Sequence, residues 1–149
     1  MSLTTEFLMN LRCIIKLHET MLKEICDQYK LQLIEAKIIS FLWNNPGKDT
    51  AADIVELRML SKGNVSQAVE SLIQRSLLER KQDQKDRRKI HLSLTSSAQP
   101  IVDSMEILWE KFEGELFVGI SKEEKELFHR VSDHIKQNTR DAMVRREKR

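Results

Sequence analysis

The spacing of the apolar residues constrains this chain more than any other feature. From Thr4 to Tyr29 apolar side chains recur every three or four residues, which places them on one face of a long helix. Residues 33–43 (LIEAKIISFLW) are more apolar still, and they end at the breaker Asn-Asn-Pro-Gly. The pattern changes after Arg75, and residues 90–94 (IHLSL) alternate strictly between apolar and polar, as a half-buried strand does. The sequence therefore predicts a mainly α chain with a small β-element.

Composition excludes several other classes of protein. The 149 residues include only 4 Gly and 2 Pro, few for a sandwich or barrel of many short strands. With 40% hydrophobic and 32% charged residues, a disordered chain is not expected. No run of about 18 apolar residues would span a membrane, and no secretory signal is recognisable. We therefore expect one domain, residues 1–149, in the cytoplasm.

The middle of the chain predicts a helix-turn-helix. Thr50 opens a short helix with Asp53 three residues later, in a capping-box-like arrangement. Ser61 is placed to cap a second helix, whose apolar face is formed by Val65, Val69, Leu72 and Ile73. The other face of that helix is polar and rich in amides. Two short helices with such a face are typical of a DNA-reading helix-turn-helix.

A two-stranded hairpin is predicted directly behind this motif. Residues 77–81 and 90–94 form the strands, and the polar, basic link QDQKDRRK forms an extended tip. A helix-turn-helix followed by a hairpin is a winged helix. Residues 75–91 hold seven Lys or Arg against three acids, although the whole chain has a net charge of only +2. Such a local stripe fits a face that meets phosphates, and a solvated loop is the alternative.

Two further helices are expected after the hairpin. With Ser97 as N-cap, Pro100 falls in the first turn, where its missing N–H costs little. An apolar stripe from Ile101 to Leu116 follows on this helix. Ser121 and Glu124 form a capping box for the last helix, which has the apolar residues Leu127, Phe128, Val131 and Ile135. These outer helices pack on each other and the core, or on a second copy.

The wing carries a family resemblance. Residues 86–95 (DRRKIHLSLT) resemble the D-x-R, apolar-x-Leu-Thr signature of the MarR (multiple antibiotic resistance regulator) family. Residues 61–80 resemble that family's recognition helix running into its first wing strand. The resemblance implies a homodimeric winged helix-turn-helix regulator with a DNA-binding lobe at residues 31–95. It also implies that helices in segments 1–30 and 96–149 interlock across the dimer, with an effector cleft between these helices and the lobe.

Two positions depart from the family pattern. Ser76 and Ala98 stand where the family usually has glycine. A non-glycine residue with positive φ costs roughly 1–2 kcal/mol, so these junctions are expected to differ slightly in geometry.

The resemblance places Arg88 at the wing tip, where an arginine can enter a narrow A·T minor groove. Arg87 and Lys89 would contact phosphates, and Asp86 would orient Arg88 through a bidentate pair. The recognition-helix candidates suit phosphates and adenine edges, with an ordinary solvated helix face as the alternative; they are Ser61, Lys62, Asn64, Ser66, Gln67 and Ser71. The candidates for lining an effector cleft are His18, Met21 and Trp109, whose side chains suit a small aromatic or amphipathic molecule.

The function predicted from these residues is a ligand-responsive repressor that binds a pseudo-palindromic operator on double-stranded DNA. The alternative is a winged-helix module that contacts protein. No phosphate loop, nucleophile elbow or metal-carboxylate cluster points to an enzyme, a cofactor or a metal site. Cys13 and Cys26 point about 140° apart on one helix, so packing is favoured over redox sensing for both.

Overall fold

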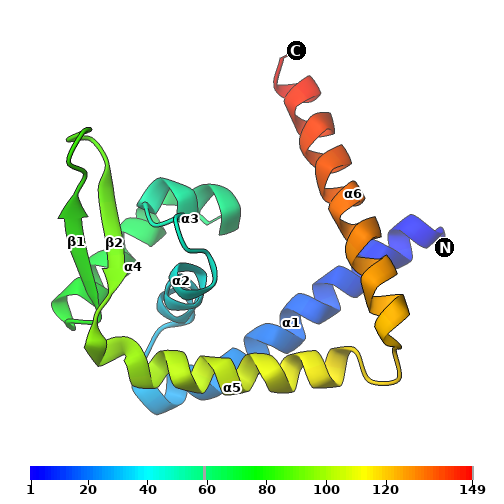
Figure 1. Cartoon of the computed structure of the whole chain (residues 1–149), viewed down its shortest axis with the longest axis horizontal. Coiled ribbons are helices and arrows are strands. Elements are labelled where there is room, and N and C mark those ends of the chain that lie inside the picture. The colour runs from blue at the N-terminus through cyan, green and yellow to red at the C-terminus, as the bar shows by residue number, and fades with distance from the viewer. Residues whose placement is uncertain (59, 149) are drawn as a thin grey trace. The chain divides into compact units, whose positions relative to one another are not determined.

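The computed structural model describes residues 1–58 and 60–148, in two compact units, Met1–Phe112 and Glu113–Arg149. The elements, in chain order, are α1 (Leu3–Tyr29), α2 (Leu33–Asn44), α3 (Ala51–Arg58), α4 (Lys62–Gln74), β1 (Leu78–Gln82), β2 (Ile90–Leu94), the 3₁₀ turn η1 (Ser96–Ala98), α5 (Gln99–Leu116) and α6 (Lys122–Glu147) (Figure 1). The mainly helical fold with a small hairpin is confirmed. No described helix combines the length and apolarity needed to cross a bilayer.

The first helix is buried only in its C-terminal part. Met21, Leu22, Ile25 and Cys26 are covered there, and α1 ends where Lys30 adopts a left-handed conformation (φ 54°). Closer to the N-terminus, α1 exposes the large apolar side chains Leu3, Phe7, Leu8, Met9, Leu11, Ile15 and Leu17. Among the described residues of the first unit, the N-terminal half of this helix is therefore mostly exposed.

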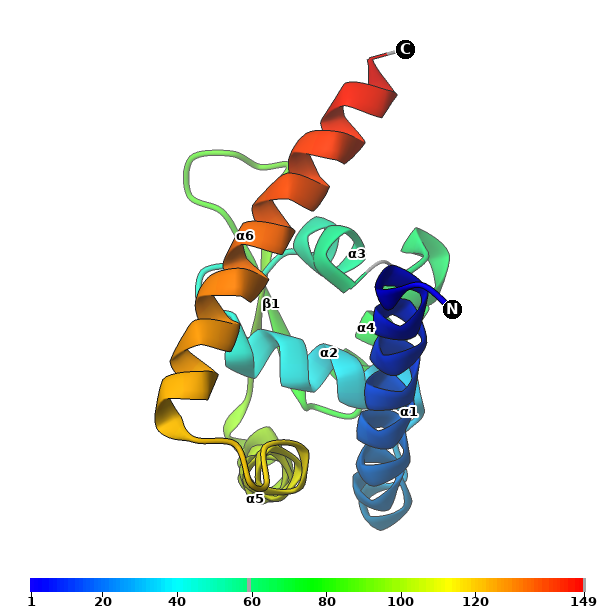
Figure 2. The same ribbon diagram turned by 90° about the vertical axis from the view of Figure 1, so that its right-hand side faces the viewer.

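The second helix is the centre of the first unit, as its apolar run predicts. Ile38 and Ile39 are completely buried, and Ala36 and Phe41 are covered as well. Figure 2 shows α2 running crosswise to α1, and α2 also packs against α4 and β2. A helix with neighbours on several sides needs apolar residues on more than one face, which explains its weak amphipathicity.

The helix-turn-helix and the wing form as the sequence predicts. Thr50 and Asp53 cap α3 reciprocally, since the Thr50 N–H donates to the Asp53 carboxylate and the Asp53 N–H donates to the Thr50 hydroxyl. Ser61 caps α4. Strands β1 and β2 pair antiparallel from Leu78 opposite Leu94 to Gln82 opposite Ile90. The Leu92 N–H also donates to the Asp49 carbonyl over 2.8 Å, which ties the wing to the α2–α3 loop.

The junction between α4 and the wing retains a left-handed residue without glycine. Ser76 has φ 61°, its N–H donates to the Ile73 carbonyl, and the Leu77 N–H donates to the Leu72 carbonyl. These two bonds close the end of α4 as a left-handed terminal residue does. Ser76 therefore keeps the turn at a cost of roughly 1–2 kcal/mol. The other departure is neutral for the backbone, because Ala98 lies in η1 and has no positive φ.

The predicted N-cap of the fifth helix is wrong. Ser97 lies inside η1, whose cap is Thr95, and α5 begins at Gln99. The reason lies at the end of β2, where the Thr95 hydroxyl donates to the Ser76 carbonyl over 2.6 Å and helical winding starts directly afterwards. Pro100 nevertheless falls in the first turn of α5, as predicted.

The second unit is dominated by α6. Its predicted capping box is present, because the Ser121 hydroxyl accepts from the Glu124 N–H and the Glu124 carboxylate accepts from the Ser121 N–H. Among the described residues of α6 no side chain is buried, and Phe128 is 56% exposed although its ring lies 5.9 Å from that of Phe117. This amphipathic helix exposes its apolar stripe.

Candidate nucleic-acid interface

The exposed face of α4 holds five of the six predicted recognition-helix residues. They are Ser61, Lys62, Asn64, Ser66 and Gln67. The opposite face, with Val65, Val69 and Leu72, is buried against the lobe. The Ser61 hydroxyl accepts from the Asn64 N–H over 3.2 Å, which fixes the start of the helix. A helix N-terminus beside a lysine suits a phosphate, and the amides suit base edges.

Ser71, the sixth candidate, has a partner inside the lobe. Its hydroxyl donates to the Glu35 carboxylate over 2.9 Å. The other Glu35 oxygen accepts from the Gln32 N–H over 2.8 Å, and the Glu35 side chain is only 3% exposed. Ser71 thus joins α4 to the N-terminus of α2 and lies half-buried at that contact.

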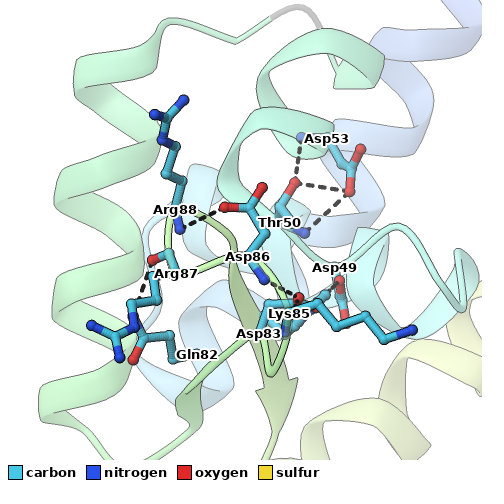
Figure 3. Close-up of polar contacts among 10 residues, drawn as sticks. Asp49, Thr50, Asp53, Gln82, Asp83, Lys85, Asp86, Arg87 and Arg88 are labelled. Carbon is cyan, nitrogen blue, oxygen red and sulfur yellow. Dashed lines mark hydrogen bonds and ion pairs between the residues drawn. The ribbon is translucent and has the colours of Figure 1, made fainter.

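The wing tip is held by two aspartates. One oxygen of Asp83 accepts from the N–H groups of Lys85 and Asp86, over 2.9 and 2.8 Å. Asp86 Oδ1 accepts from the Arg88 N–H over 3.0 Å, as Figure 3 shows. The predicted bidentate pair between Asp86 and the Arg88 guanidinium is not present among the described contacts. The aspartate fixes the backbone of the turn instead, because its short side chain reaches the N–H two residues ahead.

Within residues 75–91, the cations without a described ion-pair or carbonyl partner lie at the wing tip and at one neighbouring position. The Arg75 guanidinium donates to the carbonyls of Tyr29 and Lys30, over 2.7 and 2.9 Å, and the Arg80 guanidinium pairs with Glu70. The other five basic residues of this segment are exposed and have no ion-pair partner among the described residues: Lys81, Lys85, Arg87, Arg88 and Lys89. In Figure 3 the side chains of Arg87 and Arg88 extend away from the turn in different directions.

A histidine that the sequence analysis did not select holds the base of the wing. His91 Nδ1 lies 2.7 Å from Asp49 Oδ1, and His91 Nε2 lies 2.7 Å from Asp83 Oδ1. Hydrogen bonds to Asp49 and Asp83 raise the pKa of His91, while the His91 bond and the backbone N–H groups of the turn lower the pKa of Asp83 to about 2. Asp49 is 42 residues away in sequence, so no local pattern indicates this contact.

A cleft of about 490 Å³ opens elsewhere in the first unit, between α1, α5 and the end of α3. His18 and Trp109, two of the three effector-cleft candidates, line it, and their ring centroids lie 4.5 Å apart. Met21 is buried and does not line it. Arg58, which no sequence pattern indicated, also lines the cleft and has no carboxylate within ion-pair distance among the described residues.

Burial lowers the pKa of His18, and the charge of Arg58 lowers it further. Its Nε2 is buried without a hydrogen-bond partner among the described atoms. The cleft therefore presents an imidazole whose neutral form is favoured, aromatic faces, the Lys37–Glu19 ion pair and a guanidinium that burial has partly desolvated.

The two cysteines differ in environment. Cys13 is exposed and Cys26 is buried, and burial raises the pKa of the Cys26 thiol. A buried thiol with a raised pKa is a poor nucleophile. Cys26 is thus a packing residue. Among the described residues, no group of three or more His, Cys, Asp or Glu side chains is arranged so that it could hold a metal ion.

The sequence model of the MarR family matches residues 29–89, which contain the helix-turn-helix and most of the wing. A Bacillus subtilis relative, the uncharacterized HTH-type transcriptional regulator YwaE, is 27% identical over 124 residues, which is 80% of this chain and 72% of that protein. The predicted resemblance to this family is confirmed.

Solved structures of the same fold include the MepR–DNA complex of S. aureus. It is 19% identical, has a TM-score of 0.69, and the match covers 93% of this chain and 98% of that one. BpsR of Bordetella bronchiseptica, whose DNA binding is regulated by 6-hydroxynicotinic acid, is 21% identical with a TM-score of 0.66, over 88% and 98% of the two chains.

Proposed function

Because this chain carries the winged helix-turn-helix of the MarR family, we propose that it is a dimeric transcriptional regulator that binds a specific DNA operator. The observation that carries the proposal is the pairing of an exposed, amide-bearing α4 with an ordered wing tip whose cations lack protein partners. Polar groups on a helix read bases, and unpaired cations on a rigid turn bind phosphates or enter a minor groove.

In this proposal α4 enters the major groove. Asn64 and Gln67 contact base edges there, since a carboxamide can pair bidentately with adenine. Ser61, Lys62 and Ser66 contact phosphates near the start of the helix. At the wing, Arg88 enters the minor groove and Arg87 and Lys89 bind phosphates, while Asp86 shapes the turn. Ser71 contributes indirectly, by holding α4 on α2.

A winged-helix module that binds protein is the alternative, and the wing argues against it. Protein interfaces are depleted of lysine at their centres, and unpaired charges are costly to desolvate there. Five exposed cations on one short hairpin suit a solvated, polyanionic partner better.

Fluorescence anisotropy on labelled DNA from the chain's own upstream region tests this function. A random duplex of equal length is the control, and both are titrated across a salt series. We expect binding about 10³-fold tighter than to the control, with a salt slope that reflects several phosphate contacts. Equal affinity for the two duplexes, repeated over the flanking regions, would favour the protein-binding alternative.

We also propose that the regulator is a repressor, and that a small aromatic acid occupies the cleft beside His18 and releases it from the DNA. The rings of His18, Trp109 and Phe112 meet at tilted and edge-to-face angles and offer aromatic surface to a flat molecule, and Arg58 lacks a carboxylate partner among the described residues. BpsR, which shares the fold, responds to such a compound. Release requires only that the acid binds the DNA-free state more tightly.

The preformed DNA complex tests the effector directly. Benzoate and 6-hydroxynicotinate are added at millimolar concentration, with the uncharged benzamide as the matched control. Release by an acid and not by benzamide is the expected result. If no aromatic acid changes the DNA affinity, the cleft is not an effector site for this class.

The proposed regulator is a homodimer that acts in the cytoplasm, where its operator lies. The exposed apolar residues of α1 and α6 support the dimer, because a second copy would remove them from water. Two copies would also present two α4 helices to the half-sites of a pseudo-palindrome.

A further inference from the structure

His91 joins two acidic side chains that belong to different parts of the lobe. Asp49 lies in the loop between α2 and α3, at the base of the helix-turn-helix, and Asp83 follows β1 at the start of the wing tip. Each carboxylate lies 2.7 Å from one ring nitrogen, so the imidazole bridges them. We call Asp49, His91 and Asp83 the wing clamp.

The clamp needs a protonated ring. A neutral imidazole has one N–H donor and one acceptor nitrogen, whereas an ionised carboxylate only accepts. Two short contacts to ionised carboxylates therefore form together only when both ring nitrogens carry a hydrogen. When the ring loses one proton, the lone pair of the deprotonated nitrogen points at a lone pair of the neighbouring carboxylate. These two lone pairs repel, so one of the two hydrogen bonds of the ring must open.

The protonation of this ring affects the backbone of the wing tip, which carries Arg87 and Arg88. Asp83 uses its second oxygen to hold the N–H groups of Lys85 and Asp86, and Asp86 holds the N–H of Arg88. At the other end, the Asp49 carbonyl accepts from the Leu92 N–H, so the loop and β2 stay joined. A continuous set of hydrogen bonds thus links the imidazole to the backbone of Arg88.

The other charged groups near β2 affect the protonation of His91 less directly than Asp49 and Asp83 do. Lys81 lies opposite His91 in the strand register and opposes protonation of the ring. The charged groups of α2 and α3, the helices that pack on β2, are mostly engaged elsewhere: Lys37 with Glu19, Glu35 with Ser71, Asp53 with Thr50, Arg58 at the cleft, and Glu56 exposed to solvent. Asp49 and Asp83 are the acids in contact with the ring.

We propose that His91 is a positioning residue that makes DNA binding depend on pH, because its protonated ring holds the wing in the orientation that reads DNA. This inference rests on the proposed function and adds its regulation. Loss of the proton frees the tip from the helix-turn-helix loop. A wing that must be ordered again on binding lowers the affinity of the complex.

The direction of this pH dependence follows from the directions in which the pKa values of His91 and Asp83 are shifted. The pKa of His91 is raised above its usual 6.5, so the clamp is complete below that value and is lost as pH rises through the raised pKa. The pKa of Asp83 is lowered from 3.8 to about 2. Its contribution to the clamp is therefore complete above pH 3.8 and is lost only as the pH falls through about 2. The wing is therefore most ordered between pH 3.8 and pH 6.5, and its order decreases as the pH rises through the raised pKa of His91.

Two measurements on the full-length protein test the clamp. Ring-carbon NMR shifts of His91, assigned by comparison with His91→Gln, are followed against pH in free protein, and Asp83→Asn is expected to lower the midpoint. Operator affinity is then measured across the same pH range at constant ionic strength. We expect the wild type to lose about three- to tenfold in affinity as His91 deprotonates.

Three variants separate the clamp from a merely structural role. His91→Gln, which carries no charge, is expected to be weak and nearly insensitive to pH, whereas His91→Lys, a permanent cation, should keep tight binding at alkaline pH. His129→Gln, at an exposed position of α6 away from the apolar stripe, is the control and should follow the wild-type profile.

The two proposals fail in different ways. Specific binding whose pH profile is the same in wild type and His91→Gln would overturn the coupling and leave the proposed function intact. No specific binding at any pH would overturn the proposed function and this inference together.

Discussion

Arg88 is the residue on which the proposed DNA reading at the wing depends most. It is exposed, its N–H is fixed by Asp86, and its guanidinium has no ion-pair partner among the described residues. Arg88→Ala is expected to weaken operator binding by at least about 1 kcal/mol and to relax the preference for A·T at the wing position. Anisotropy on operators with A·T or G·C at that position measures both effects.

Arg87→Ala is the matched comparison, since this neighbour is assigned to a phosphate. It should weaken all duplexes alike and reduce the salt slope by about 1. Sedimentation should show an unchanged oligomeric state for both variants. If Arg88→Ala leaves operator affinity unchanged, the wing takes no part in recognition.

The sequence predicted the roles of some single residues better than those of others, and the difference has a physical reason. Arg88 and the α4 face could be selected because their signals are local: a basic tip between two strands and a polar face opposite an apolar one. The roles of Asp86 and Ser71 were less accessible, since each depends on which of several acceptors or donors lies near. His91 gave no signal, because its partner Asp49 approaches only when the wing folds onto the α2–α3 loop.

At the scale of elements, the contact between α2 and α4 sets the position of the recognition helix. The buried Glu35 carboxylate accepts from Ser71 of α4 and from Gln32 at the start of α2. Ser71→Ala removes one of these bonds and leaves a buried charge less satisfied. We expect a loss of about 1.5–3 kcal/mol in the free energy of unfolding, measured by urea denaturation.

Ser66→Ala is the control for this prediction, because Ser66 is exposed on the same helix. It should leave stability nearly unchanged. The contrary result for Ser71→Ala, full stability with reduced DNA affinity, would mean that the Ser71 hydroxyl contacts DNA directly.

The elements themselves were largely predictable, because helices, strands and caps are specified by neighbours a few residues apart. The capping boxes at Thr50 and Ser121 are of this kind. The start of α5 was not, since it depends on the bond from Thr95 to the Ser76 carbonyl across the hairpin. Likewise, only the structure shows that Ser76 keeps a left-handed backbone where glycine would be easier.

At the scale of the whole molecule, each of the two units exposes apolar side chains along a helix. On α6, Leu127, Phe128, Val131 and Ile135 are between 42% and 56% exposed, and α1 exposes a second set near its N-terminus. Soluble monomers rarely expose such long apolar stripes. Coverage by a second copy would place two reading lobes on one duplex, and linked sites bind far more tightly than one.

The double variant Val131→Asp, Ile135→Asp tests this arrangement. Both side chains face solvent in the single chain, so we expect the lobe to stay folded while the charges prevent burial of the stripe in a dimer. Sedimentation velocity should then show a monomer. Operator affinity should fall by about 100-fold or more, because each half-site is bound singly.

Gln137→Glu is the control, since residue 137 lies about 120° around the helix from Val131. It also adds negative charge to α6, but off the apolar stripe, and should remain dimeric. The salt slope separates assembly from charge repulsion: a monomer that neutralises half as many phosphates should show about half the wild-type slope. A double variant that is monomeric and still binds the full operator with wild-type affinity and slope would show that one lobe is sufficient for recognition.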